Sequence, residues 1–256
     1  MFSRAPARKG QSGQASVEAA LTLPLMVFLM LGTLQLFLML QGRIMAEYAA
    51  FRAVRAGSVN HGSCESMTHS AILALMPSFY SFMGGSGGSP GQKLGRAFGA
   101  RKDNRFVPRF DGGHDGSIVW IVRDSPVYTS VPREDLDFDI PRLSSTEIVR
   151  LEIQLVYWFP LKIPFANWVI SRMVLARWGL KSYDAANPLN PADRQAGWTA
   201  ESTPTLAVAI QQEMLRRGDS RQYTLPILAT GGLRMMTPVQ ARYFLTQNCP
   251  PTPEVL

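Results

Sequence analysis

The longest apolar run of the chain lies near its N-terminus, from Ala19 to Leu40, and contains no charged residue. Its polar interruptions are Thr22, Thr33 and Gln35. A helix rises about 1.5 Å per residue, so a run of this length can cross the roughly 30 Å hydrocarbon core of a bilayer. We therefore predict a membrane span over residues 19–40.

The helical pattern continues beyond the apolar run, through residues 41–56. Large side chains recur there at helical spacing, at Ile44, Tyr48 and Phe51. Gly57 is of the type that commonly follows the last residue of a helix, and Pro24 predicts a kink inside the span. The pattern thus predicts one long helix over residues 14–57, of which the second half lies outside the membrane.

The rest of the chain changes to short elements. Alternating or β-branched and aromatic residues predict strands at residues 117–123 and 147–159, and two further strands separated by a glycine break within residues 222–238. Helical patterns cover residues 63–77 and the stretch from Thr203 to Gly218. We expect an α+β fold in which the long helix packs on a small antiparallel sheet with extra short helices.

Within this expected domain, residues 58–256, two loops stand out. Residues 84–91 are rich in glycine and predict a flexible loop. Residues 93–109 hold six Lys or Arg against a single acid, Asp103. A solvated loop is the simpler interpretation of that basic stretch, and contact with anionic lipid heads or an acidic partner is the alternative. The proline-rich end of the chain predicts an extended tail.

Residues 165–180 form an apolar segment that carries charge. Arg172 and Arg177 lie inside it, and Trp168 and Trp178 lie near its ends. The segment is short for a second membrane span. Three interpretations stay open: a buried helix of the domain, a helix lying on the membrane surface, and a contact face for a partner subunit.

Charges around the first apolar run are unevenly placed. Arg4, Arg8 and Lys9 precede it with no acid among them, which predicts a cytoplasmic N-terminus and an extracytoplasmic domain. Glu18 stands at the edge of the run, where a free carboxylate drawn into lipid would be costly. We therefore expect the carboxylate of Glu18 to pair with another group that offsets this cost.

The sequence around Glu18 resembles the class III signal segments of prepilins, in which a membrane peptidase cuts after a glycine and glutamate is the fifth mature residue. Gly13 would be the last residue of a leader, residues 1–13, and Gln14 the first mature residue. Within that group GQASVEAALTLPLMVFLMLGTLQ is similar to the TadE-like pseudopilins of tight-adherence pili. An aromatic residue follows the glutamate in the related small pilins, whereas Ala19 does so here, which favours a pseudopilin.

The resemblance implies a minor, non-enzymatic pseudopilin in the bacterial inner membrane with a periplasmic domain, needed for pilus assembly or adhesion. Its implied partners are the prepilin peptidase, other pilins or pseudopilins, the inner-membrane assembly platform and the lipid bilayer. Glu18 would pair with the new amino group of Gln14 on a neighbouring subunit and so set the register of the helices.

Other functions remain as alternatives. An uncleaved signal anchor would make the chain a periplasmic assembly scaffold, and a type I secretory signal would have a shorter apolar region. An anchored hydrolase would need a nucleophile with a placed base, and the common motifs for one do not occur. We predict no catalytic residue, no cofactor and no metal site.

Net charge and cysteine content add two points. The formal charge is +7 and is spread along the chain, so we expect no nucleic-acid partner. The two cysteines, Cys64 and Cys249, are a candidate disulfide in an oxidising compartment, the alternative being two free thiols. Such a bridge was expected to tie the tail to the membrane-proximal end of the domain.

Overall fold

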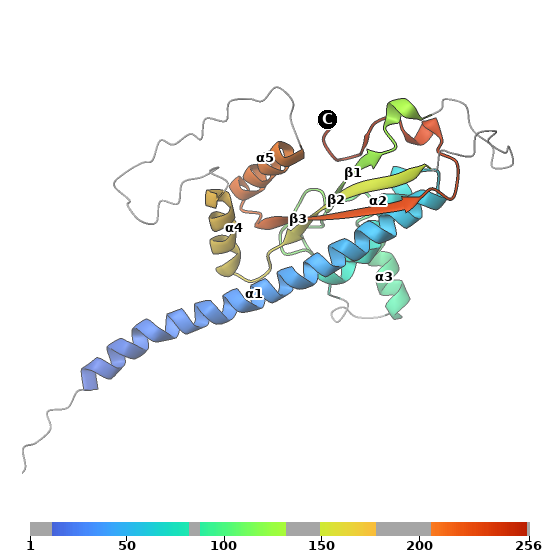
Figure 1. The fold of residues 1–256 in the computed structure, drawn as a ribbon. Helices are drawn as coiled ribbons and strands as arrows, with labels where there is room; N and C mark the ends of the chain where they lie inside the picture. The colour runs from blue at the N-terminus through green and yellow to red at the C-terminus, as the bar shows by residue number, and fades with distance from the viewer. Residues whose placement is uncertain (1–11, 82–87, 132–148, 178–205, 255–256) are drawn as a thin grey trace, which may run out of the picture.

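The computed structural model describes residues 12–81, 88–131, 149–177 and 206–254. These residues confirm the predicted α+β class: a long N-terminal helix lies against a four-stranded antiparallel sheet, and shorter helices surround the sheet (Figure 1). The helices are α1 (Ser12–Val59), α2 (Cys64–Phe79), α3 (Pro90–Gly99), α4 (Ala166–Arg177) and α5 (Leu206–Asp219). The strands are β1 (Val119–Ser125), β2 (Arg150–Pro160), β3 (Thr224–Arg234) and β4 (Asn248–Cys249).

Helix α1 is continuous over 48 residues, and Pro24 lies inside it. The prediction that Gly57 follows the last helical residue is wrong, because the helix runs on to Val59. Gly57 is instead a close-contact position, since a Cβ atom there would lie 2.7 Å from side-chain atoms of Leu151 and Met67. The chain turns after the helix at His61 and Gly62, both with positive φ.

The sheet has the strand order β3-β2-β1-β4. Strand β3 passes without interruption through Gly231 and Gly232, which pair with Ile153 and Glu152 of β2. The predicted division of residues 222–238 into two strands is therefore wrong. A Cβ atom on Gly231 would lie 3.1 Å from the carbonyl oxygen of Ala50, so glycine permits the close approach of α1 rather than breaking the strand.

Both faces of the sheet are covered where β2 ends. Alternate residues of a strand point to opposite faces, and on one face Leu151 and Phe159 meet α1. On the other face, Trp158 packs edge-on against Trp120 and under the guanidinium of Arg217 from α5, 4.4 Å from the ring centre. The alternation of buried and partly exposed residues in β2 accordingly gives way to continuous burial from Leu155 onward.

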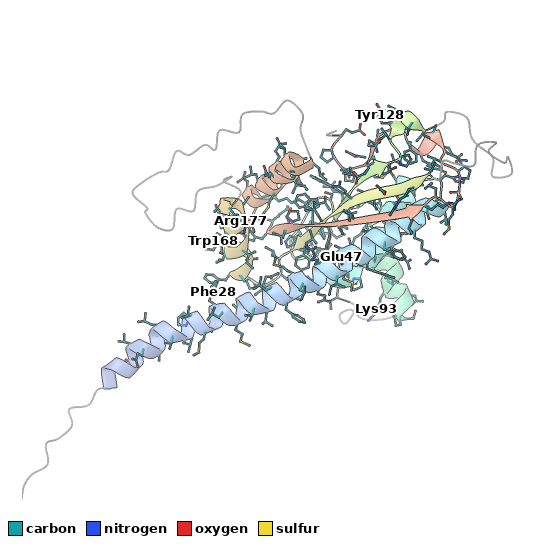
Figure 2. All side chains as sticks on the ribbon, in the orientation of Figure 1. Phe28, Glu47, Lys93, Tyr128, Trp168 and Arg177 are labelled. Atoms are coloured by element: carbon teal, nitrogen blue, oxygen red, sulfur yellow. A yellow bond between two sulfur atoms is a disulfide. The ribbon has the colours of Figure 1, made fainter. Side chains whose placement is uncertain are left out.

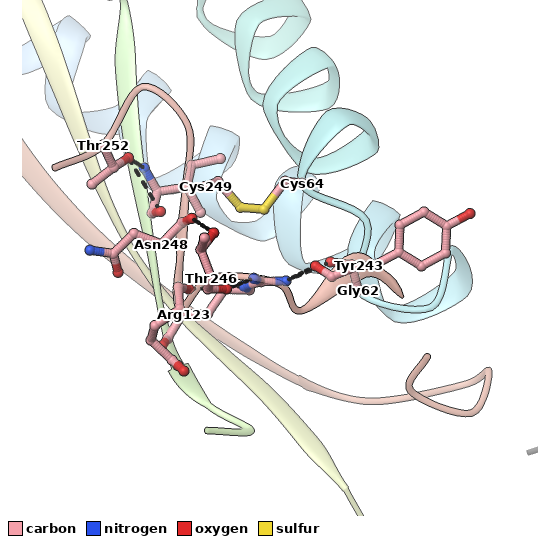
Figure 3. The surroundings of a disulfide bond; sticks show 10 residues. Gly62, Cys64, Arg123, Tyr243, Thr246, Asn248, Cys249 and Thr252 are labelled. Atoms are coloured by element: carbon pink, nitrogen blue, oxygen red, sulfur yellow. Dashed lines mark hydrogen bonds between the residues drawn. A yellow bond between two sulfur atoms is a disulfide. The ribbon is translucent and has the colours of Figure 1, made fainter. Parts of the chain in front are cut away.

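The C-terminal segment is part of the sheet and not the extended tail that its prolines predicted. Strand β4 pairs with β1, and the Thr252 hydroxyl accepts a hydrogen bond of 2.9 Å from the Ile121 amide. Cys249, the last residue of β4, forms a disulfide with Cys64 (Figure 3). Cys64 follows the outer end of α1, so the bridge closes the end of the domain farthest from the apolar run, and the expected membrane-proximal closure is wrong.

Arg123 anchors the same region from within β1. Its guanidinium donates to the carbonyl oxygens of Gly62, Tyr243, Thr246 and Gln247 and lies 3.9 Å from the centre of the Phe244 ring (Figure 3). The side chain is fully buried, and burial lowers the pKa of Arg123 to about 10. Because it satisfies several otherwise unpaired carbonyls, this cation holds the C-terminal loop against the turn that follows α1.

The expected loops at residues 84–91 and 93–109 are partly wrong. Helix α3 occupies residues 90–99, beginning with a capping box between Ser89 and Gln92. Arg101 is buried rather than solvated, 2.6 Å from the equally buried carboxylate of Asp111. Arg101 and Asp111 are ten positions apart in the chain, so a local sequence pattern does not predict this ion pair.

Candidate assembly surface

The inner half of α1 is exposed almost all round. By length and composition α1 can cross a membrane from Ser16 onward, and only 6% of its most apolar window is buried inside the protein. Leu21, Met26 and Met30 are among its most exposed apolar side chains. Figure 2 shows the side chains of this half projecting from a stretch of helix that the rest of the protein leaves uncovered. Such a helix, exposed and near the N-terminus, indicates membrane anchoring.

The predicted processing and register residues lie in the first turns of α1. Gly13 and Gln14 are helical, and Glu18 is exposed one turn later. The Thr22 hydroxyl donates a hydrogen bond of 2.8 Å to the main-chain carbonyl of Glu18 and leaves the carboxylate available. Cleavage after Gly13 and pairing of Glu18 with a neighbouring Gln14 stay predictions.

The outer half of α1 has two different faces, and small residues form the one that contacts the sheet. The fully buried positions there are mostly small, namely Ala46, Ala49, Ala50, Ala53 and Ser58, and Val54 is the one larger side chain among them. Gly42 continues this face, and a Cβ atom on it would lie 2.6 Å from the Phe159 ring. The absence of side-chain bulk thus brings the axis of α1 close to β2 and β3.

Large apolar side chains form the outward face. Ile44, Tyr48 and Phe51 are 56%, 48% and 49% exposed. With about 3.6 residues per turn, they project roughly opposite to Ala46 and Ala50. The exposed ion pair between Arg43 and Glu47, 3.3 Å apart, lies along one flank. We call Ile44, Tyr48 and Phe51 the outer stripe, an apolar strip beyond the predicted span of the kind that marks an interaction surface.

The residues that lead into α4 meet the inner half of α1 through two specific contacts. The Ile163 amide donates a hydrogen bond of 2.9 Å to Oε1 of Gln35, which is fully buried. The Phe165 ring packs edge-on against Phe28, with ring centres 5.5 Å apart. Gln35 is the lone amide in the apolar run, and that exception is the signal by which sequence analysis could have singled it out.

The structure distributes the residues proposed for membrane or partner contact as follows. Trp168 is exposed, Arg172 is half-buried, and Arg177 lines a cavity between α4 and α1. Trp178 lies outside the described residues. Helix α4 is therefore only partly a buried helix of the domain, because its outward side is open.

Among the described residues, no group of three or more His, Cys, Asp or Glu is placed to hold a metal ion. The ring nitrogens of His114 lie within hydrogen-bond distance of the carbonyl oxygens of Asp111 and Tyr223, so this ring stabilises a turn. What α1 presents to the outside is apolar surface with flanking charge.

One comparison with known proteins gives a match. A family model described as TadE-like protein matches residues 13–55, which cover the apolar run, Glu18 and the outer stripe. No curated protein and no solved structure matches the chain. The similarity therefore lies in the long helix, and the domain that packs on it is outside the match.

Proposed function

Because residues 13–55 match a family model described as TadE-like protein, we propose that the chain is a minor pseudopilin that enters or primes a tight-adherence (Tad) pilus. The observation that carries the proposal is the outer stripe. Ile44, Tyr48 and Phe51 are held on a rigid helix, beyond the predicted span and on the side turned away from the chain's own core.

Assembly would pack the α1 helices of neighbouring subunits side by side. Aromatic side chains fixed on a helix lose little entropy on binding and are common anchors of protein interfaces. The exposed inner half would contact neighbouring helices in the same way after leaving the bilayer. The other partners would be the prepilin peptidase and the inner-membrane assembly platform, and the role is non-enzymatic.

Processing would remove residues 1–13 and create a new amino group on Gln14. Glu18 would offer its carboxylate to that group on a neighbouring subunit. Pairing removes the cost of an unpaired carboxylate in lipid and fixes one helix against the next.

The topology that we propose places the N-terminus in the cytoplasm and the domain in the periplasm. The basic residues before the span support this orientation. The Cys64–Cys249 disulfide supports it independently, because such bridges persist in oxidising compartments.

The first test is the intact mass and N-terminal sequence of the membrane-extracted protein, from cells with and without the prepilin peptidase. We expect a chain beginning at Gln14 that appears only when the peptidase is present. Replacing Gly13 by leucine should leave the leader attached. A chain that keeps residues 1–13 in both strains would contradict the proposal and favour an uncleaved periplasmic scaffold.

A second test separates processing from assembly. Glu18→Ala should be cleaved and inserted like the unmodified chain, because cleavage depends on Gly13, yet it should assemble poorly. Immunoblots of the membrane fraction and of sheared pili measure the two steps separately. Normal piliation with Glu18→Ala would overturn the register argument while leaving cleavage intact.

A further inference from the structure

A groove lies between the inner half of α1 and α4. It encloses about 490 Å³, within the range of small-molecule sites. Its walls are apolar except for the guanidinium of Arg177 at its rim. The lining includes Phe28, Gly32 and Leu36 from α1 and Val169, Met173 and Arg177 from α4. Gly32 opens the floor, because a Cβ atom there would meet nothing within 4 Å.

The position of the groove along α1 determines whether lipid or water surrounds it. Phe28, Gly32 and Leu36 all lie inside the apolar run of residues 19–40. A helix that crosses the bilayer with this run therefore holds the groove at the level of lipid rather than of water. Figure 1 shows α4 standing across the direction of α1, beside this part of the long helix.

The exposed side chains in and next to α4 are of types that suit a position in lipid. Phe165, just before α4, and Trp168 and Met173 within it are exposed, Met173 by 60%, and each would be costly to hydrate. Tryptophan favours the membrane interface, and arginine can keep its charge among headgroups while its stem lies in apolar surroundings. Figure 2 shows Trp168 and Arg177 on α4, above Phe28 of α1.

We propose that this groove holds an acyl chain of a phospholipid from the leaflet next to the domain, with the Arg177 guanidinium at the lipid phosphate. An extended polypeptide segment in its place would bring main-chain amides and carbonyls against apolar walls that offer them no hydrogen bonds. An acyl chain carries no such groups. The cation at the rim meets the single anionic group that a phospholipid places at the end of its chains.

The inference requires that α1 spans a membrane, and it does not depend on the pilus role. A chain that is never cleaved or assembled would still carry the groove. Loss of lipid contact and failure of pilus assembly are therefore separate outcomes.

The test uses the full chain in vesicles of phosphatidylethanolamine and phosphatidylglycerol that contain a phosphatidylglycerol with a photoreactive diazirine on one acyl chain. After irradiation, mass spectrometry maps the labelled peptides. We expect label on residues 166–177. Gly32→Leu fills the groove without a clash and should lower this labelling about tenfold, as expected for a loss of the order of one decade in affinity.

Two variants control the experiment. Thr33→Leu adds a similar side chain at an exposed position of α1 that does not line the groove, and it should leave the labelling of residues 166–177 unchanged. Arg177→Gln should lower the labelling, whereas Arg177→Lys, which keeps a cation at the rim, should retain most of it. Circular dichroism and the Cys64–Cys249 bridge on a non-reducing gel report whether each variant folds.

Two results would overturn the proposal: absence of label on residues 166–177 in the unmodified chain, or equal labelling in Gly32→Leu and Thr33→Leu. A photoreactive benzoylphenylalanine at Met173 gives an independent check. Transfer of this group to lipid supports the proposal, whereas transfer to a second copy of the chain would mean that a protein surface fills the groove and would overturn it.

Discussion

The two faces of the outer half of α1 differ in side-chain size, and the larger apolar side chains lie on the exposed face, contrary to the usual rule that such side chains are buried. The face inside the protein is built from Ala46, Ala50 and Ala53, whereas the face outside carries Tyr48 and Phe51. Small residues inside let the main chains of α1 and β3 approach closely, since a Cβ atom on Gly231 would lie only 3.1 Å from the carbonyl oxygen of Ala50. Burying an aromatic or aliphatic side chain yields about 1.5–3 kcal/mol, and the outward face leaves that free energy for association.

The comparison therefore teaches that one helix separates two tasks by face. Its inward residues fix the fold, and its outward residues are available to another molecule. The predictions below test that division, beginning with the largest expected change in folding free energy.

The largest effect should come from opening the disulfide that closes the outer end of α1. Cys64→Ser should lower the free energy of unfolding by about 2–5 kcal/mol, since the bridge spans a long loop. Urea unfolding of the detergent-solubilised chain, with and without reductant, measures the loss. A double Cys64→Ser and Cys249→Ser variant should match the reduced chain, and an unmodified chain that is insensitive to reductant would contradict the prediction.

The next effect concerns the inward face itself. Ala50→Leu should destabilise the domain by about 1–3 kcal/mol, because extra methylenes in a close-packed contact force the main chain apart. Tyr48→Leu is the matched control on the outward face and should change stability by no more than about 0.5 kcal/mol. Thermal unfolding of the two variants compares the faces directly, and equal losses would break the distinction between them.

The side of the sheet that α5 covers should respond to pH through Glu213. Burial alone would raise the pKa of Glu213, but hydrogen bonds and charge from Arg216 and Arg217 outweigh it and hold this pKa below its ordinary value of 4.5. A lowered pKa contributes stability that is present above pH 4.5 and is lost as the pH falls through the value in the folded protein.

Glu213→Gln isolates this contribution. The variant should be less stable than the unmodified chain at pH 7, because Arg217 loses its charged partner, and the difference should shrink between pH 5 and pH 3. Melting curves of both proteins across this range measure it. A difference that stays constant with pH would show that Glu213 contributes shape rather than charge.

The smallest effect on folding should accompany a large effect on assembly. The double variant Tyr48→Ala and Phe51→Ala removes exposed side chains and should change stability by only about 0.5 kcal/mol. It should nevertheless reduce piliation strongly, because the outer stripe loses its aromatic anchors. Electron microscopy and sheared-pilus blots measure the extent of piliation. Full piliation of the double variant would show that assembly does not need the outer stripe.

Much of this architecture follows from local pattern. The unbroken apolar run predicts the long helix because a helix in lipid must satisfy its own hydrogen bonds and expose apolar side chains. Strand β2 follows from its alternation of apolar and polar residues, and the candidate cleavage residues Gly13 and Gln14 follow from a short motif. These features depend on residues that are close together in the chain, so the sequence alone is enough to predict them.

Other features depend on residues that are distant in the chain. The pairs Gln35 with Ile163, Arg101 with Asp111 and Cys64 with Cys249 form only when the fold brings them together. The predicted glycine break in β3 was wrong for the same reason, since the contact that Gly231 permits is with α1. Periodicity marks a face as apolar without stating which neighbour covers it.

The sequence by itself therefore determined a long apolar helix, its candidate processing motif and the α+β class. Only the tertiary structure decided which face of α1 is buried, where the disulfide lies and that α4 meets α1 at the level of the apolar run. The physical reason is that a helix is specified by successive residues, whereas the side that it buries is selected by the closest packing available among all the elements.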